Sequence, residues 1–411
     1  MVADGVMQVA SFAGRLLSLP AILATRWFSE EEGRDLVPRG PGNPGLTIRA
    51  KAAIDEIFFL TEILAGAPLA FFDTDRIMGE TTDAVNFLQA EGYLDDPASY
   101  HRTPQAPRHF EIESREIGGM VAEHLSFESS YEPHEGEPGR ARWLSYEPNH
   151  TAHARIFRHA GEDRPWVVCI PGYRMGQELA DTVAFRVQWL HRDLGLNVAI
   201  PVLPFHGPRT SGRRSGDNFL TGDFVDTLHA QSQAVHDIRA LLAWIRSQGA
   251  PQIGLYGLSL GSYTAALVAS LEDELDCVIA GIPAVDFVDL IQTNTSGWAL
   301  RLTGLLGFPW DSVSEMLRVV SPLELPLRTA SSRCFLFAGL YDRVAPPEQA
   351  RALWRHWGRP RLVWYRGGHV SFLIENEVRD LLAEAFRRTG LVPDPVWTPQ
   401  LDSLRPALAR S

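Results

Sequence analysis

Residues 252–261, Gln-Ile-Gly-Leu-Tyr-Gly-Leu-Ser-Leu-Gly, decide the fold of this chain. The apolar run 253–256 is typical of a short buried strand, and small and apolar residues at helical spacing follow Gly261. A G-x-S-x-G sequence between a strand and a helix predicts a tight turn that holds its serine in a strained backbone conformation. Bulky side chains at positions 257 and 261 would collide with neighbouring backbone. The stretch therefore predicts that Ser259 is an exposed nucleophile.

A serine hydroxyl is almost wholly protonated at neutral pH, so it needs a base, and the base needs an orienting carboxylate. Two later segments can supply them. The apolar run 334–338 leads through a glycine turn to Asp342, and the run 362–365 leads through Gly367-Gly368 to His369. One β–α–β step separates the two residues, so both loops should open on the same edge of a parallel sheet. We predict that Ser259, Asp342 and His369 form a catalytic triad.

Each of these assignments has an ordinary alternative. Ser259 could be the exposed serine of a simple glycine turn, and Asp342 could accept hydrogen bonds from local turn amides. His369 is one of 13 histidines, and Asp286 and Asp289 are reserve candidates for the acid. The order serine, acid, histidine, with each residue following its own strand, favours the triad.

Acyl chemistry also needs two backbone amides to stabilise an oxyanion. The amide of Leu260, directly after the serine, is the first candidate. The second is the amide of Tyr173 in the loop after the strand 166–170, and the Arg174 amide is a weaker one. We further predict that the side chains of Arg174, His206 and Trp310 line the substrate pocket, although His206 fits a turn residue equally well.

Together these residues resemble the α/β-hydrolase superfamily, within its esterase, dienelactone-hydrolase and prolyl-oligopeptidase-like branch. The resemblance covers roughly residues 110–390 and depends on Gly257–Gly261, on Ser321-Pro322-Leu323 before the strand that ends at Asp342, and on Gly368-His369. The chain is also distantly similar to the abhydrolase-domain group with an extended N-terminus. The resemblance to the superfamily implies a mostly parallel central sheet with helices on both faces. The family's Arg-Gly-His-Gly-type loop is replaced here by 204–208, Pro-Phe-His-Gly-Pro, which leaves the subfamily and substrate open.

The spacing of strands and helices predicts an α/β architecture with additions at both ends. We expect a helical extension over 1–107, the hydrolase domain over 108–390 and a Pro-rich tail over 391–411. Strands near 109–116, 121–131 and 141–158 should form the antiparallel part of the sheet. An apolar insertion over 290–330 predicts a small helical lid. After the Tyr173 loop, helical spacing predicts one buried helix face formed by Leu179, Val183, Val187 and Leu190.

Composition narrows the class of protein. A net charge of −12 argues against a nucleic-acid-binding protein, because such proteins carry a basic surface. Metal-binding spacings and Gly-rich phosphate loops do not occur, so we expect neither a metal nor another cofactor. The apolar stretch 16–24 is too short to span a membrane. We expect a cytoplasmic protein with possible peripheral membrane contact through its N-terminus.

The sequence thus predicts a serine hydrolase that cleaves a carboxylic ester through an acyl-enzyme. An apolar lid favours a small-molecule ester with an apolar acyl or aryl group. Hydrolysis of an amide, peptide or thioester bond and acyl transfer use the same triad and stay open. An inactive scaffold and a membrane-associated lipid-handling protein are alternatives of a different class. The substrate's identity and the oligomeric state cannot be obtained from the sequence.

Overall fold

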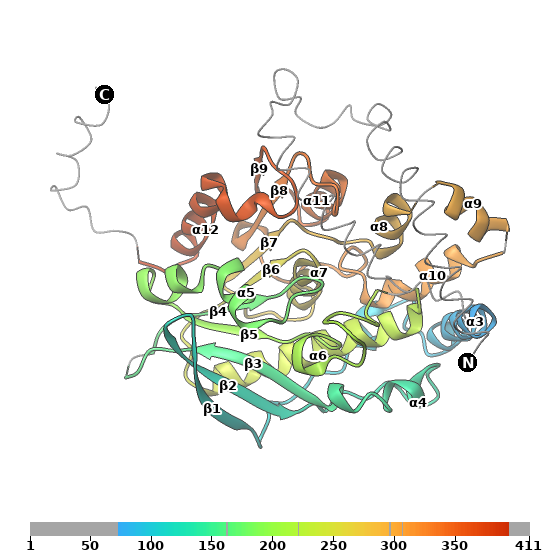
Figure 1. The fold of residues 1–411 in the computed structure, drawn as a ribbon, viewed down its shortest axis with the longest axis horizontal. Coiled ribbons are helices and arrows are strands. Elements are labelled where there is room, and N and C mark those ends of the chain that lie inside the picture. The colour runs from blue at the N-terminus through green and yellow to red at the C-terminus, as the bar shows by residue number, and fades with distance from the viewer. Residues whose placement is uncertain (1–72, 162, 221, 296, 306, 394–411) are drawn as a thin grey trace.

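The computed structural model describes residues 73–161, 163–220, 222–295, 297–305 and 307–393. Within them a nine-stranded sheet has the order β1-β2-β3-β5-β4-β6-β7-β8-β9 (Figure 1). β1, β2 and β3 pair antiparallel, β3 pairs antiparallel with β5, and the six strands from β5 to β9 are parallel. The predicted fold class is confirmed. The strands are β1 (Glu111–Ile117), β2 (Met120–Glu128), β3 (Thr151–Phe157), β4 (Trp166–Ile170), β5 (Asn197–Pro201), β6 (Ile253–Leu258), β7 (Cys277–Gly281), β8 (Cys334–Gly339) and β9 (Arg361–Tyr365).

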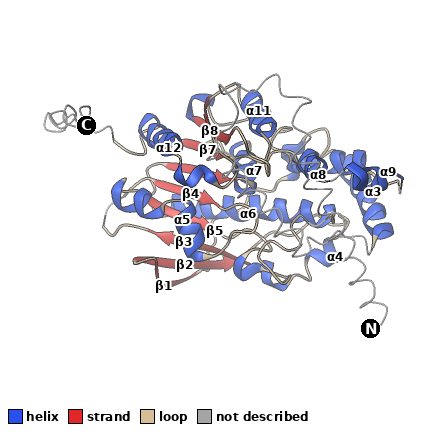
Figure 2. Ribbon diagram, turned by 45° about the horizontal axis from the view of Figure 1, so that its top comes forward, coloured by secondary structure: helices blue, strands red, loops and turns tan. Residues whose placement is uncertain are grey.

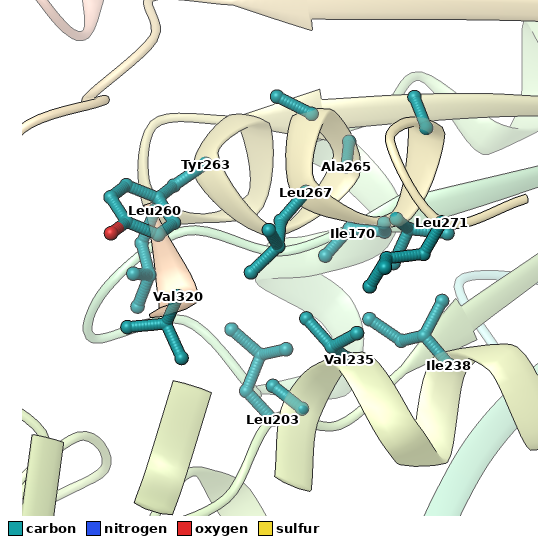
Figure 3. Close-up of a cluster of buried hydrophobic side chains, with 14 of the residues drawn as sticks. Ile170, Leu203, Val235, Ile238, Leu260, Tyr263, Ala265, Leu267, Leu271 and Val320 are labelled. Carbon is teal, nitrogen blue, oxygen red and sulfur yellow. The ribbon is translucent and has the colours of Figure 1, made fainter. Parts of the chain in front are cut away.

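Helices cover both faces of the sheet, as alternating strand residues require. In β4, Val168 and Ile170 belong to a hydrophobic cluster with α6 (Phe224–Ser247), α7 (Leu260–Ala269) and α11 (Pro347–His356), whereas Val167 and Cys169 face the cluster of α12 (Asn376–Arg388). Figure 2 shows this layered arrangement of strands and helices. In the first cluster, Val235 and Ile238 of α6 face Leu267 of α7 (Figure 3). The parallel strands β4 to β8 are buried on both faces, which explains their continuous apolar runs, whereas the edge strand β9 is only partly buried.

A second group of helices gathers at one end of the molecule (Figure 1). They are α3 (Thr74–Ala90), α8 (Phe287–Asn294), α9 (Gly297–Leu305) and α10 (Trp310–Leu317). Figure 1 shows them far from α5 (Glu178–Ala184) and α12. α10 contacts α3, α6 and α8, so the predicted insertion packs against the N-terminal helix that the structure describes. The predicted domain boundaries and the lid role stay predictions. Residues 1–72 of the predicted helical extension, with the apolar stretch 16–24, lie outside the described residues.

Two expectations about single elements were wrong. The strand expected over 141–158 begins only at Thr151, because Arg140–Trp143 forms a short helix, α4, and Glu147–His150 forms a helical turn that contains Pro148. Pro148 has no N–H to donate to a neighbouring strand. The helix after the Tyr173 loop also breaks, because Arg186 adopts a left-handed conformation with φ 52°.

The break at Arg186 changes which side chains the helix buries. Val187 and Leu190 after the break are buried as expected, but Leu179 and Val183 before it are 61% and 59% exposed. Their helix, α5, instead buries Asp181 and Thr182. Apolar spacing alone therefore misjudged which face of α5 packs on the sheet.

Candidate active site

Ser259 lies at the C-terminal end of β6 in a strained conformation, with φ 55° and ψ −115°. The two glycines of the motif make this turn possible. A Cβ on Gly257 would lie 2.2 Å from the Gly261 oxygen, and a Cβ on Gly261 would lie 1.9 Å from the Ile170 oxygen. The elbow helix thus touches β4 directly, and only glycine fits at either position.

Hydrogen bonds fix the elbow on both sides. The Ser259 amide donates to the Gly281 oxygen at 3.0 Å, and the Ser262 hydroxyl lies 2.8 and 2.7 Å from the oxygens of Gly257 and Gly281. Ser262 is fully buried one turn into α7. The serine backbone is therefore held by its neighbouring strand, β7, as well as by its own helix.

The predicted acid and base lie together. His369 Nδ1 is 2.7 Å from Asp342 Oδ2, and the two residues are only 8% and 5% exposed. Asp342 Oδ1 accepts hydrogen bonds from the amides of Val344 at 2.9 Å and Ala345 at 2.8 Å. These amides orient the carboxylate so that its other oxygen is directed at the imidazole. The pairing fixes the proton on Nδ1 and presents Nε2 as the basic nitrogen.

The loops that carry this pair are joined to each other. The Tyr341 amide donates to the Gly367 oxygen at 3.1 Å, and a Cβ on Gly339 would lie 2.4 Å from that same oxygen. The Gly368 oxygen accepts hydrogen bonds from the Tyr365 hydroxyl at 2.8 Å and the Ser371 hydroxyl at 3.2 Å. Sequence reasoning missed these two hydroxyls, which hold the residue before His369.

The two oxyanion candidates come from different elements. Leu260 is the first residue of α7, where backbone amides have no acceptor within the helix and the helix dipole is positive. The Tyr173 loop approaches the serine, because a Cβ on Gly172 would lie 3.3 Å from the Ser259 Cβ. The Arg174 amide is committed to His206 Nε2 at 3.3 Å. Because the Arg174 amide already donates to His206, it is not the second oxyanion donor. The Leu260 and Tyr173 amides stay predictions for that role.

The remaining predicted pocket residues make contacts within the protein. The Arg174 guanidinium pairs with Asp217 and donates to the Ser215 oxygen at 3.0 Å. His206 is 1% exposed, and its Nδ1 lies 2.8 Å from the Pro204 oxygen. Burial lowers the pKa of His206 to about 4, and the nearby positive charges of Arg174 and Arg209 add to this effect. His206 is therefore neutral. Its Nδ1–H donates to the Pro204 oxygen, and its Nε2 accepts the hydrogen bond from the Arg174 amide.

Trp310 lies at the start of α10. Its indole nitrogen donates to the Thr303 hydroxyl at 3.1 Å, and its ring centroid is 4.8 Å from that of Phe308 and 5.8 Å from that of Phe224. The reserve acids have local partners. Asp286 caps α8 by accepting the Asp289 amide at 2.9 Å, and Asp289 accepts a hydrogen bond from Gln349 at 2.6 Å.

A buried ion pair behind the Tyr173 loop was missed by the sequence reasoning. Arg155 of β3 lies 2.5 Å from Asp181 of α5, and the two side chains are 2% and 0% exposed. Arg155 donates to the Gly176 oxygen at 2.6 Å, and the Gly176 amide donates to both Asp181 oxygens at 3.1 Å. The pair thus holds both backbone groups at the end of the loop. An arginine within an apolar strand was the one sequence signal that pointed to it.

Within the described ranges, groups of three or more His, Cys, Asp or Glu placed to hold a metal ion do not occur. The same ranges contain no helix with the length and apolar character needed to cross a bilayer. The three cysteines are buried and free.

The sheet order and the strained serine after β6 define an α/β-hydrolase fold, and comparison with solved structures agrees. The chain is similar to acetyl xylan esterase 1 from Thermoanaerobacterium sp. JW/SL YS485, with a TM-score of 0.50 and 14% sequence identity, over 73% of this chain and 93% of that one. Such a distant likeness shows the fold alone. The predicted α/β-hydrolase fold is therefore confirmed, and the assignment to a branch of the superfamily stays a prediction.

The family follows from closer relatives. The chain is 40% identical over 358 residues to the uncharacterized protein Rv2627c of Mycobacterium tuberculosis (strain ATCC 25618 / H37Rv), covering 86% of this chain and 85% of that protein. The uncharacterized protein MT2702 of M. tuberculosis (strain CDC 1551 / Oshkosh) matches with the same identity and coverage. The chain belongs to the family of these two proteins. No family model matches it.

Proposed function

We propose that this protein is a serine hydrolase that cleaves carboxylic esters through an acyl-enzyme, with Ser259, His369 and Asp342 as its triad. The main support is the buried Asp342–His369 pair at 2.7 Å, at the same sheet edge as the strained serine turn. A histidine whose Nδ1 is bound to a carboxylate has a basic Nε2, which is the nitrogen that serine activation requires.

In this mechanism the Ser259 oxygen attacks the ester carbonyl while His369 Nε2 takes the hydroxyl proton. The amides of Leu260 and Tyr173 stabilise the oxyanion. The tetrahedral intermediate then collapses, the C–O bond to the alcohol breaks, and His369 gives its proton to the departing alkoxide. A water molecule, deprotonated by the same imidazole, attacks the acyl-enzyme, and collapse releases the acid and restores the Ser259 hydroxyl.

The proposed substrate is a small ester with an apolar acyl or aryl group. The support is the aromatic content of the insertion, where Phe308 and Trp310 pack against Phe224 at the start of α6. Amides, peptides, thioesters and a second acyl acceptor fit the same residues. A substrate panel therefore has to include each of these bond types.

The test is labelling by a fluorophosphonate, with peptide mapping of the adduct and turnover of p-nitrophenyl esters of increasing acyl length. We expect the adduct on Ser259, and loss of turnover by about 10⁴-fold or more in Ser259→Ala. Asp342→Asn should lower turnover by about 10³–10⁴-fold, because the amide cannot favour the imidazolium. Ser332→Ala, an exposed serine before β8, is the matched control and should retain full activity. An adduct on another residue, or esterase activity that survives Ser259→Ala, would refute the proposal.

A further inference from the structure

One flank of the molecule exposes aliphatic side chains that the fold does not explain. Leu179 and Val183 lie one turn apart on α5 and are 61% and 59% exposed, and Ile374, in the turn after His369, is 71% exposed. All three line one open groove of about 570 Å³ between α5 and the start of α12. They are three of the seven large hydrophobic side chains that the described residues expose.

This apolar surface continues onto its neighbours. The groove shares Met120 with a second depression that follows the start of β2, next to Val121, which is 76% exposed. It shares Trp189 and Arg379 with a third along α12. Exposed apolar side chains that gather in one place mark an interaction surface, whereas scattered ones do not.

This flank has a higher proportion of positive charge than the chain as a whole. The chain carries a net charge of −12, yet arginines outnumber carboxylates in the lining of these three depressions. The arginines are Arg158, Arg186, Arg192, Arg379 and Arg387, and the acids are Glu123, Asp193, Glu375 and Asp380. Arg158 pairs with Glu123 at 3.0 Å. Arg379 lies over the ring of the half-buried Trp189, with its guanidinium carbon 5.7 Å from the centroid. An arginine–tryptophan pair beside exposed aliphatic residues suits the boundary between acyl chains and headgroups.

Arg186 adds a cation from inside the groove. One of its nitrogens donates to the oxygens of Phe372 at 3.1 Å and Leu373 at 2.8 Å. Within the described part of the chain, no carboxylate lies within ion-pair distance of its guanidinium, and burial lowers its pKa. A half-buried cation whose partners are carbonyl groups favours the approach of an anion.

We propose that this flank, formed by α5, the turn Ser371–Ile374 and the exposed side of α12, docks on the surface of an anionic lipid bilayer. Leu179, Val183 and Ile374 enter the acyl boundary, and the arginines bind headgroup phosphates. The proposal goes beyond the ester chemistry and does not depend on it. It also differs from the expected contact through the N-terminus, because it assigns membrane binding to the part of the chain that the structure describes.

The experiment is co-sedimentation of the full chain with vesicles of phosphatidylcholine alone and of phosphatidylcholine with 30% phosphatidylglycerol. We expect binding to the anionic vesicles that weakens as salt is added. The variant L179D/V183D/I374D should lose binding about tenfold or more, because three charged side chains then face the acyl region. All three positions are more than half exposed, so the variant should fold. Leu305→Asp, at the 85% exposed position in α9, is the matched control and should bind like wild type.

A second pair of variants tests the charges. Arg379→Gln should weaken binding to anionic vesicles about fivefold, whereas Arg355→Gln, exposed on α11 across the sheet, should not. Equal binding of the triple variant and wild type, or no binding by wild type, overturns the proposal. So does concentration-dependent dimerisation that the triple variant abolishes, because the flank is then an interface between copies of this chain.

Discussion

At the scale of single residues, the turn that carries Ser259 depends on neighbouring glycines, which have no Cβ. Gly257 and Gly261 let backbone segments meet around Ser259 at distances that a Cβ would not permit, and a Cβ on Gly172 would lie in tight contact, 3.0 Å from the Leu258 oxygen. The strain at Ser259 is tolerated because β7 and the Ser262 hydroxyl fix the backbone on both sides.

This packing leads to a prediction about glycine replacements. Gly261→Ala should lower the free energy of unfolding by about 3 kcal/mol or more, because the new methyl group would overlap the Ile170 oxygen, which belongs to rigid backbone. Gly79→Ala in α3 should instead raise it by about 0.5–1 kcal/mol, because nothing lies within 4 Å and alanine favours a helix. Urea unfolding of both variants measures the difference. Similar stabilities would contradict the packing around the elbow.

At the scale of elements, the Arg155–Asp181 pair ties α5 to β3 and both to the end of the Tyr173 loop. Its side chains are almost completely removed from water, so each charge depends on the other. Because the pair binds the amide and oxygen of Gly176, the loop's position depends on an interaction between two elements far apart in sequence.

We therefore predict different costs for two changes in the same helix. Asp181→Asn should destabilise the protein by about 3–5 kcal/mol, because Arg155 then remains buried without a counter-charge. Glu178→Gln should cost less than about 1 kcal/mol, because its ion pair with Arg115 spans 3.5 Å between side chains that are 40% and 45% exposed. Denaturant unfolding compares the two, and equal losses would argue against a special role for the buried pair.

At the scale of the whole molecule, buried histidines couple stability to pH. Burial lowers the pKa values of His101, His153 and His206 to about 4, below their ordinary value of 6.5. Between these values the unfolded chain takes up protons that the folded chain does not. The free energy of unfolding should therefore fall as the pH is lowered from about 7 to about 4.

His206 offers the cleanest test, because it is 1% exposed. The wild type should lose about 2 kcal/mol through this residue between pH 7 and pH 5. His206→Gln is expected to be less stable at pH 7 but to lose correspondingly less on acidification. Unfolding by urea at both pH values gives the comparison. A variant with an unchanged pH dependence would show that His206 titrates normally in the folded protein.

The sequence predicted the parallel strands and the loops that follow them because both leave local signals. Short apolar runs ending at glycine located β6, β8 and β9, and each proposed triad residue follows one of them. The antiparallel strand β3 was placed too early, because its alternating pattern extends into α4 and the turn at Pro148. The prediction of one buried helix face from Leu179 to Leu190 was wrong for another reason. Periodicity cannot reveal the left-handed conformation of Arg186, which breaks the helix.

By itself, then, the sequence determined the serine elbow, the order of its partner residues and the α/β layering, since these follow from backbone preferences and apolar spacing within a few residues. Only the tertiary structure decided that Asp342 meets His369, that Arg155 and Asp181 share a buried site, and that Leu179 and Val183 face outward. The reason is physical. Burial, and therefore the energy of a charge or an apolar side chain, depends on what distant segments place around it.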